Sequence, residues 1–267
     1  MLFGTFKNPK GPSWEDPETT VLHLSGTVVE FSLPRSNYTA PSYAMGGTIE
    51  RSKEDYSIDI SKYKPTKINN CAKNELIYDV QLKRIFNFNG LPLLGTSMGA
   101  LNFTLSICSN ACNEFRNNFF DCFFQRLEKL HGKKETDGYL YRLYPINWSL
   151  IDINEVSFLN YGVEDFLFHP KGISTFRMEF VCPINSNTAL DFKFHFDGIP
   201  LKSGGIKLAH ELIKKIMQTC KVIYTPEHKQ QVDALDLKEK FKPIKPVIWE
   251  NYKKAPRVDY SILEKYL

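Results

Sequence analysis

Hydrophobic and polar residues alternate in steps of two along several stretches of the first half of this chain. In one of them, Leu101, Phe103 and Leu105 are separated by Asn102 and Thr104. This period places every second side chain on the same face, which is typical of a strand with one buried face. The pattern predicts strands at residues 29–33, 56–60, 76–88 and 101–107.

The second half of the chain shows the same alternation. It predicts strands at residues 139–144, 149–158, 176–182 and 190–196. The last two stretches are joined by a short polar segment around Asn185 and Asn187, so we expect them to pair as antiparallel strands. On the final strand, His195 falls on the polar register together with Lys193 and Asp197. We expect that register to face solvent.

In two places the hydrophobic period changes to three and four residues, which is typical of an amphipathic helix. The first helix is predicted from Phe115 to Leu130, and Gly132 is a natural stop because glycine is common just past a helix end. The second helix is predicted after a glycine pair, on an apolar stripe from Ile206 to Cys220.

The order of these elements is strands followed by a helix, and then strands followed by a second helix. This order predicts an α+β fold with antiparallel sheets and two amphipathic helices. The repetition allows two similar sheet-plus-helix halves, at residues 1–132 and 133–223. Residues 224–267 are rich in proline, lysine and isolated aromatic residues, which predicts an extended tail that packs on the body through its rings.

Composition changes this picture by excluding several classes of protein. The chain has 267 residues, of which 42% are hydrophobic, so it can bury a large core. Its 34 basic and 30 acidic residues give a net charge of only +4, which argues against a nucleic-acid-binding surface. No apolar run approaches the roughly 20 residues that span a bilayer. The first residues lack a secretory signal pattern, so we expect a cytoplasmic protein whose six cysteines are reduced core thiols.

Metal and cofactor motifs are incomplete. Three cysteines and one histidine lie between positions 108 and 131, namely Cys108, Cys112, Cys122 and His131. No second close pair completes the spacing of a zinc site. The pair Gly204 and Gly205 precedes the second helix, but no phosphate-binding glycine motif surrounds it. We therefore predict neither a metal nor a cofactor.

The segment from Gly95 through Ser97 to Gly99 matches the G-x-S-x-G signature of serine hydrolases. That signature needs a buried strand before the serine and a helix after it. Here Pro92 lies just before the motif, where a central strand needs every backbone N–H, and the predicted strand at 101–107 follows it. The context favours a turn between two strands. A serine hydrolase remains the alternative function.

An acidic and aromatic window lies inside this basic chain. Between Arg142 and Lys171 there is no lysine or arginine, whereas four acidic residues occur there. Trp148, Phe158 and Tyr161 are interleaved with these acids, and aromatic residues rimmed by charge are common in protein–protein interfaces. The same alternation also fits a strand pair with its aromatic face in the core and its acids in water. Both interpretations stay open.

Three parts of the chain occur in a characteristic order. They are LHLSGTVVEFSLP at residues 22–34, WSLIDIN at 148–154 followed by FLNY at 158–161, and AHELIKKIM at 209–217. In layout they resemble the bacterial immunity proteins that are encoded beside type VI secretion effectors. Members of that family bind and neutralise a cognate toxin. The resemblance implies a protein–protein inhibitor with no catalysis and no cofactor.

The resemblance also gives the acidic window a role. Many toxins that attack nucleic acids or nucleotides carry basic clefts, which an acidic surface complements. The candidate partner-binding residues are Trp148, Asp152, Glu155, Tyr161, Glu164 and Asp165. We expect the partner to be the toxin, and we assign no catalytic residue. A scaffold protein with a different partner is a further alternative.

Overall fold

The computed structural model describes residues 9–35, 56–63, 75–90, 97–110, 115, 118–132, 140–167, 173–199 and 204–249. Its strands are β1 (Glu18–Leu24), β2 (Thr27–Leu33), β3 (Tyr56–Ile58), β4 (Leu76–Asn89), β5 (Ser97–Asn110), β6 (Leu140–Ile153), β7 (Val156–Leu167), β8 (Ile173–Pro183), β9 (Thr188–Asp197), β10 (Lys221–Ile223) and β11 (Val247–Trp249). Its helices are α1 (Phe119–His131), α2 (Gly204–Thr219), α3 (Pro226–Asp233) and α4 (Leu237–Lys240), with a 3-10 turn η1 (Ile60–Tyr63).

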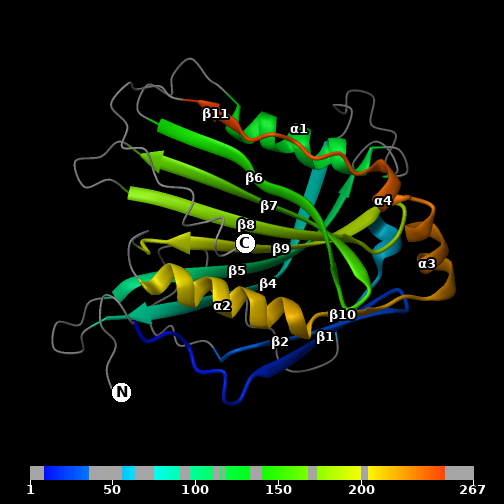
Figure 1. The fold of residues 1–267 in the computed structure, drawn as a ribbon. Helices are drawn as coiled ribbons and strands as arrows, with labels where there is room; N and C mark the ends of the chain where they lie inside the picture. The colour runs from blue at the N-terminus through cyan, green and yellow to red at the C-terminus, as the bar shows by residue number, and fades with distance from the viewer. Residues whose placement is uncertain are drawn as a thin grey trace.

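The strands form two sheets (Figure 1). The larger sheet has the order β11-β6-β7-β8-β9-β5-β4, and its neighbouring strands pair antiparallel. The smaller sheet has the order β10-β2-β1-β3, in which β1 and β3 run parallel and the other pairs run antiparallel. The predicted α+β class, with antiparallel sheets and amphipathic helices, is confirmed.

The β8–β9 hairpin shows how the alternating pattern becomes structure. Phe192 and Phe194 of β9 are fully buried on one face, as their period of two predicts. The turn is closed by Asn185, whose side-chain oxygen accepts hydrogen bonds from the backbone N–H groups of Asn187 and Thr188, both at 2.8 Å. The antiparallel pair predicted for these two segments is confirmed.

Two hydrophobic cores lie on opposite faces of the larger sheet. On one face, α2 and the smaller sheet cover apolar side chains of β4, β5, β8 and β9 (Figure 1). The helix predicted on the stripe from Ile206 is confirmed by α2, which buries Ile213 and Ile216 in this core. On the other face, α1 covers apolar side chains of β6, β7 and β8.

Helix α1 begins later than the hydrophobic pattern predicts. Its first residue is Phe119 and its N-cap is Asn118, whereas Phe115 is buried but lies before the helix. Its end is as predicted. Gly132 follows the last helical residue, and its N–H donates to the backbone oxygen of Glu128 at 2.8 Å.

The larger sheet curves around α1. Phe124 of α1 packs edge-on against Trp148 of β6, with ring centroids 6.1 Å apart. The guanidinium of Arg126, two residues further on, lies 4.2 Å from the ring centroid of Tyr78 on β4. Since β6 and β4 are separated by four other strands, one short stretch of helix contacts both only because the sheet is bent. The bend gathers polar side chains of β4, β5, β8 and β9 beside the helix.

The boundary predicted at residue 132 does not separate two sheets. Strand β5 from the first segment pairs with β9 from the second, from Ala100 opposite Asp197 to Ser109 opposite Thr188. Strand β10 of the second segment pairs in turn with β2 of the first. Residues 1–132 and 133–223 therefore share both sheets, because strands that are distant in sequence satisfy each other's backbone hydrogen bonds.

The tail predicted as extended from residue 224 is helical over part of its length, in α3 and α4. The reason is a local start signal, because the Thr225 side chain accepts a hydrogen bond from the N–H of His228 at 3.1 Å and Pro226 occupies the first helical turn. Beyond the helices, β11 is extended and pairs with β6. The tail residues 250–267 lie outside the described residues.

Candidate functional site

The six predicted partner-binding residues do not form one surface. Trp148, Tyr161 and Glu164 are 6%, 0% and 0% exposed, so they are not surface anchors. Helix α1 covers Trp148 and Tyr161, whereas Glu164 lies on the other face of β7, in register with the buried Phe176 of β8. Trp148 stacks on Tyr161 with ring centroids 5.4 Å apart, and Phe124 closes over it.

Asp165 belongs to a separate cluster of charges. Its carboxylate accepts a hydrogen bond from Nε of Arg142, and it lies 3.9 Å from Nδ1 of His131. The Asp165 side chain is partly buried by these contacts. It therefore contributes to the packing of α1 on β6 and β7 rather than to an open acidic surface.

Asp152 and Glu155 are the two predicted residues that remain exposed. They lie at the β6–β7 turn, where Asp152 accepts hydrogen bonds from Oγ of Ser157 and Nζ of Lys238, both at 2.7 Å. The hydrogen bond from Lys238 is the main reason that the pKa of Asp152 lies below its usual value. Asp152 thus stays ionised at a lower pH than an ordinary aspartate does.

The structure brings two further acids to this turn from a distant part of the chain. A cleft of about 230 Å³ lies between the β6–β7 turn and helices α3 and α4, and Glu155, Asp233 and Asp236 line it. Lys229 and Lys238 line it as well. We call this feature the acidic cleft. Its charged residues are the lining residues Glu155, Asp233, Asp236, Lys229 and Lys238, together with Asp152, which does not line the cleft but is hydrogen-bonded to Lys238.

The acidic cleft carries four carboxylates and two ammonium groups, which gives a local charge of −2 in a chain of net charge +4. Tyr224 and Leu237 form part of its apolar wall. The sequence pattern missed Asp233 and Asp236 because they lie about 80 residues beyond Asp152 and Glu155, and only the packing of α3 and α4 against the turn brings them there.

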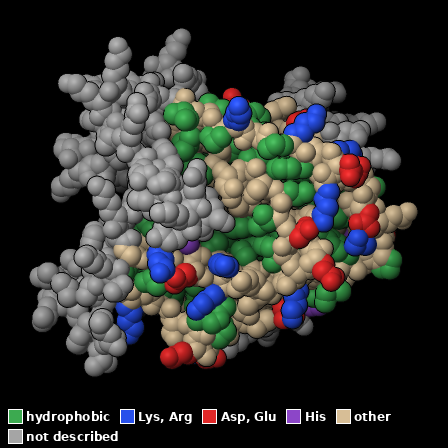
Figure 2. Space-filling view, in the orientation of Figure 1, with side chains coloured by type: hydrophobic (Ala, Val, Ile, Leu, Met, Phe, Trp, Pro, Cys, Tyr) green, Lys and Arg blue, Asp and Glu red, His purple; other side chains and the backbone are tan. Residues whose placement is uncertain are grey.

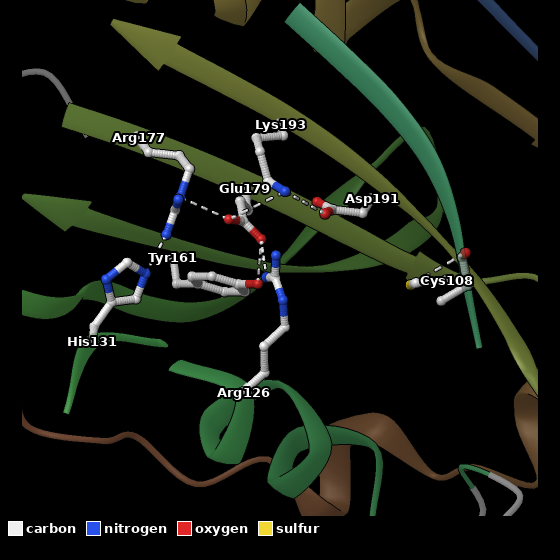
Figure 3. A network of polar contacts seen from close by, with 9 residues as sticks. Cys108, Arg126, His131, Tyr161, Arg177, Glu179, Asp191 and Lys193 are labelled. Carbon is white, nitrogen blue, oxygen red and sulfur yellow. Dashed lines mark hydrogen bonds and ion pairs between the residues drawn. The ribbon is translucent and has the colours of Figure 1, made fainter. Parts of the chain in front are cut away.

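A second cluster of charges is buried beneath α1 (Figure 3). We call it the buried ion cluster, and its members are Arg126, Tyr161, Arg177, Glu179, Asp191 and Lys193. Glu179 is at its centre. One carboxylate oxygen of Glu179 accepts from Tyr161 Oη at 2.6 Å and from Arg126 at 3.0 Å, and the other lies 2.9 Å from Nε of Arg177.

The two buried carboxylates respond in opposite ways to this environment. Burial alone raises the pKa of Glu179, but the cations Lys193, Arg126 and Arg177 outweigh it and hold the pKa well below the usual value. Lys193, at 3.5 Å, is the one described cation within ion-pair distance of Asp191, and Arg126 and Arg177 act on it from further away. Burial, together with the charge of Glu179, raises the pKa of Asp191 to about 6.

The buried ion cluster opens on one side to a larger cleft. This cleft, of about 620 Å³, lies between α1 and strands β4 and β5, and Arg126 and Lys193 line it. Both cations also approach the ring of Tyr78, at 4.2 Å and 5.3 Å from its centroid. The cations thus bridge from the buried carboxylates to solvent and fix α1 to the sheet.

The cysteines that the structure describes are buried thiols, as predicted from the sequence. Cys108, Cys122, Cys182 and Cys220 are buried and free. Burial raises the pKa of each thiol, so they remain protonated and unreactive at neutral pH. In the described part of the chain, no group of three His, Cys, Asp or Glu residues is placed to hold a metal ion. Cys112 lies outside the described residues.

The backbone around Ser97 does not form a hydrolase elbow. Ser97 is the first residue of β5, and the chain continues as a strand to Asn110, with no helix after the serine. Gly99 has a φ of +107°, and a Cβ there would lie 2.5 Å from the backbone oxygen of Asp197. This close approach to the end of β9 explains the glycine without a catalytic role.

We expect no labelling of Ser97 by a fluorophosphonate probe, because the strand that follows it supplies no helix N-terminus for an oxyanion. Peptide mass spectrometry after incubation checks this, with an authentic serine hydrolase in the same tube as the positive control. Modification of the peptide that contains Ser97, and its loss in Ser97→Ala, would reinstate the hydrolase alternative.

No protein-family model matches this chain, and no curated protein matches its sequence. Among the helices that the structure describes, none is long and apolar enough to cross a bilayer.

Proposed function

We propose that this protein binds and neutralises a cognate bacterial toxin in the cytoplasm, as immunity proteins encoded beside type VI secretion effectors do, and that it performs no catalysis. The observation that carries the proposal is the acidic cleft. Its local charge opposes the net charge of the chain. Such a reversal favours encounter with a partner of opposite sign and disfavours self-association through the same surface.

The shape of the acidic cleft fits a basic protein surface. Glu155 and Asp236 are exposed at its mouth, so an incoming lysine or arginine reaches them without displacing other groups. Tyr224 provides a partly buried aromatic wall that is held in place by its hydroxyl, which donates to the backbone oxygen of Pro183 at 2.9 Å. A rigid aromatic wall beside carboxylates is a common setting for an interfacial hot spot. The basic cleft of a toxin that acts on nucleic acids or nucleotides has the complementary chemistry.

Binding without catalysis is also supported by the contacts of Glu179, the buried carboxylate at the centre of the buried ion cluster. Glu179 is engaged by Tyr161, Arg126 and Arg177, which leaves it little freedom to act as a base. These contacts join α1 to β7 and β8, so the buried ion cluster has a sufficient structural explanation.

The product of the reading frame adjacent to this gene is the partner for the test. Reversing Asp152 and Glu155 to lysine turns two attractive charges into repulsive ones, so we expect the Kd for that protein to rise at least about tenfold, mainly through slower association. Isothermal titration and stopped-flow mixing at two ionic strengths measure both effects. The wild-type affinity should fall as salt rises.

The control is a matched pair of exposed acids on other surfaces. Asp16 and Glu211 are also exposed and in ion pairs, with Arg35 and Lys207, and their reversal to lysine is expected to leave the Kd within about twofold. Equal affinities for both double variants would remove the acidic cleft from the interface. A neighbouring protein that inhibits growth and is neither bound nor neutralised would contradict the function itself.

A further inference from the structure

A pocket of about 290 Å³ lies on the face of the larger sheet that α1 does not cover, between α2 and strands β6, β7 and β8. Its walls are mostly apolar and include Ile153, Met178, Phe180, Ile213 and Met217. In Figure 2, hydrophobic side chains are visible in the hollow between α2 and the strands above it. The pocket is separate from the acidic cleft and from the buried ion cluster, since neither shares a residue with it.

Asn160 is the exceptional residue in this wall. It is 4% exposed, yet among the described residues none donates a hydrogen bond to its side-chain oxygen. On the neighbouring strand its partner in register is Phe180, which is also buried. A buried amide oxygen that receives no hydrogen bond from the described residues is costly, so its presence in an apolar wall calls for an explanation.

The Asn160 amide is accessible from the pocket, and the buried part of the pocket wall carries no charge. His210 also lines the wall, and burial lowers its pKa to about 4, so the ring is neutral at neutral pH. Lys214 and Gln218 stand at the exposed rim. An apolar body of small size fits the walls, and a neutral donor–acceptor pair fits the Asn160 amide, which itself carries one acceptor and two donors.

We propose that this pocket binds a small neutral molecule with an apolar body and a carboxamide or lactam edge, which pairs with the side-chain amide of Asn160. The apolar walls supply affinity through burial, and the two-point amide pairing supplies selectivity. Because the proposal rests on the α2 face, it stands whether or not the acidic cleft binds a toxin.

Benzamide and acetophenone are the probes that test this, because they have nearly the same shape and differ in whether an NH₂ or a methyl group stands beside the carbonyl. We expect the full chain to bind benzamide about tenfold more tightly than acetophenone, as measured by protein-observed NMR titration. In Asn160→Leu the preference should fall to about one, because leucine keeps the branched shape of asparagine but has no amide to pair with either probe.

One control tests whether the Asn160→Leu variant is folded, and a second tests whether benzamide binds in this pocket. Asn160→Leu removes a buried amide oxygen that receives no hydrogen bond from the described residues, so its thermal midpoint should be equal to or above that of the wild type. Lys214→Trp places a ring over the mouth and should weaken benzamide binding, whereas Lys215→Trp, at the adjacent exposed position of α2 that does not line the pocket, should leave it unchanged. Equal affinities for the two probes, no binding of either, or a preference that survives in Asn160→Leu would overturn the proposal.

Discussion

Glu179→Gln is expected to lower the free energy of unfolding by about 3 kcal/mol. Glutamine keeps the size of the side chain and can still accept from Tyr161, but it removes the negative charge that Arg126 and Arg177 share. Both arginines are mostly buried, with side chains 15% and 22% exposed, so neither is fully hydrated once its carboxylate is lost. Removal of one partner from a buried ion pair is costly for this reason.

Urea unfolding of the wild type and of Glu179→Gln measures this loss. Glu211→Gln is the control, because Glu211 is an exposed acid in a helix with one lysine at 3.9 Å, and its loss should cost less than about 0.5 kcal/mol. Arg126→Met in the Glu179→Gln background should recover part of the stability, since it removes a cation that has lost its partner. A loss below about 1 kcal/mol in Glu179→Gln would contradict this expectation, and would mean that water in the cleft beside α1 hydrates the two arginines in place of the carboxylate.

Asp191→Asn is expected to stabilise the protein increasingly as the pH rises from about 4 to about 6, and by on the order of a few kcal/mol at pH 8. The pKa of the Asp191 carboxyl rises from 3.8 to about 6 on folding, because burial and the charge of Glu179 disfavour its ionised form. Among the described residues, none donates a hydrogen bond to either oxygen of Asp191. One pKa unit corresponds to about 1.4 kcal/mol, so ionisation of this buried group opposes folding by the amount stated.

The direction of the pH effect follows from proton binding. Between pH 3.8 and about 6 the folded state holds a proton on Asp191 that the unfolded state has lost, so this group makes the protein less stable as pH rises through that window. Burial lowers the pKa of His131 to about 3 and of His210 to about 4, so the histidines make the protein more stable as pH rises towards 6.5. The two trends oppose each other in the wild type.

Thermal or urea unfolding from pH 4 to pH 8 separates these contributions. In Asp191→Asn the opposing trend is removed, so stability should rise more steeply with pH than in the wild type, and the two proteins should be similar near pH 4. Parallel profiles for the two proteins would show that Asp191 does not change its protonation in this range.

The fold could be predicted largely from the hydrophobic periods. The alternation of Phe192 and Phe194 marks β9, and the three-and-four period from Ile206 marks α2, because in each case the apolar face has its core partner along the whole element. The pattern does not say which faces of two strands meet the same helix. The sequence therefore left open whether Trp148 and Tyr161 are surface anchors or core residues, and in the structure both are covered.

The charged clusters could not be predicted for a related reason. A polar residue that alternates with apolar ones is expected to face water, and this holds only while nothing covers the polar face. Lys193 and His195 lie on such a register, but the sheet bends around α1 and leaves both partly buried. Burial lowers the pKa of His195 accordingly. The contribution of Asp233 and Asp236 to the acidic cleft could not be predicted, because the β6–β7 turn that they approach is remote in sequence.

The pairing of β5 with β9 has a consequence for how the protein is made. The middle of the larger sheet joins residues 100–109 to residues 188–197, so its hydrogen bonds cannot form until almost three-quarters of the 267 residues have been synthesised. Until then β5 presents one long edge without its final neighbour, and contacts of such sequence separation slow folding. During this period the apolar side chains of β5, among them Phe103 and Leu105, are exposed to other newly made chains. We therefore expect the yield of folded protein to depend on temperature and on chaperones.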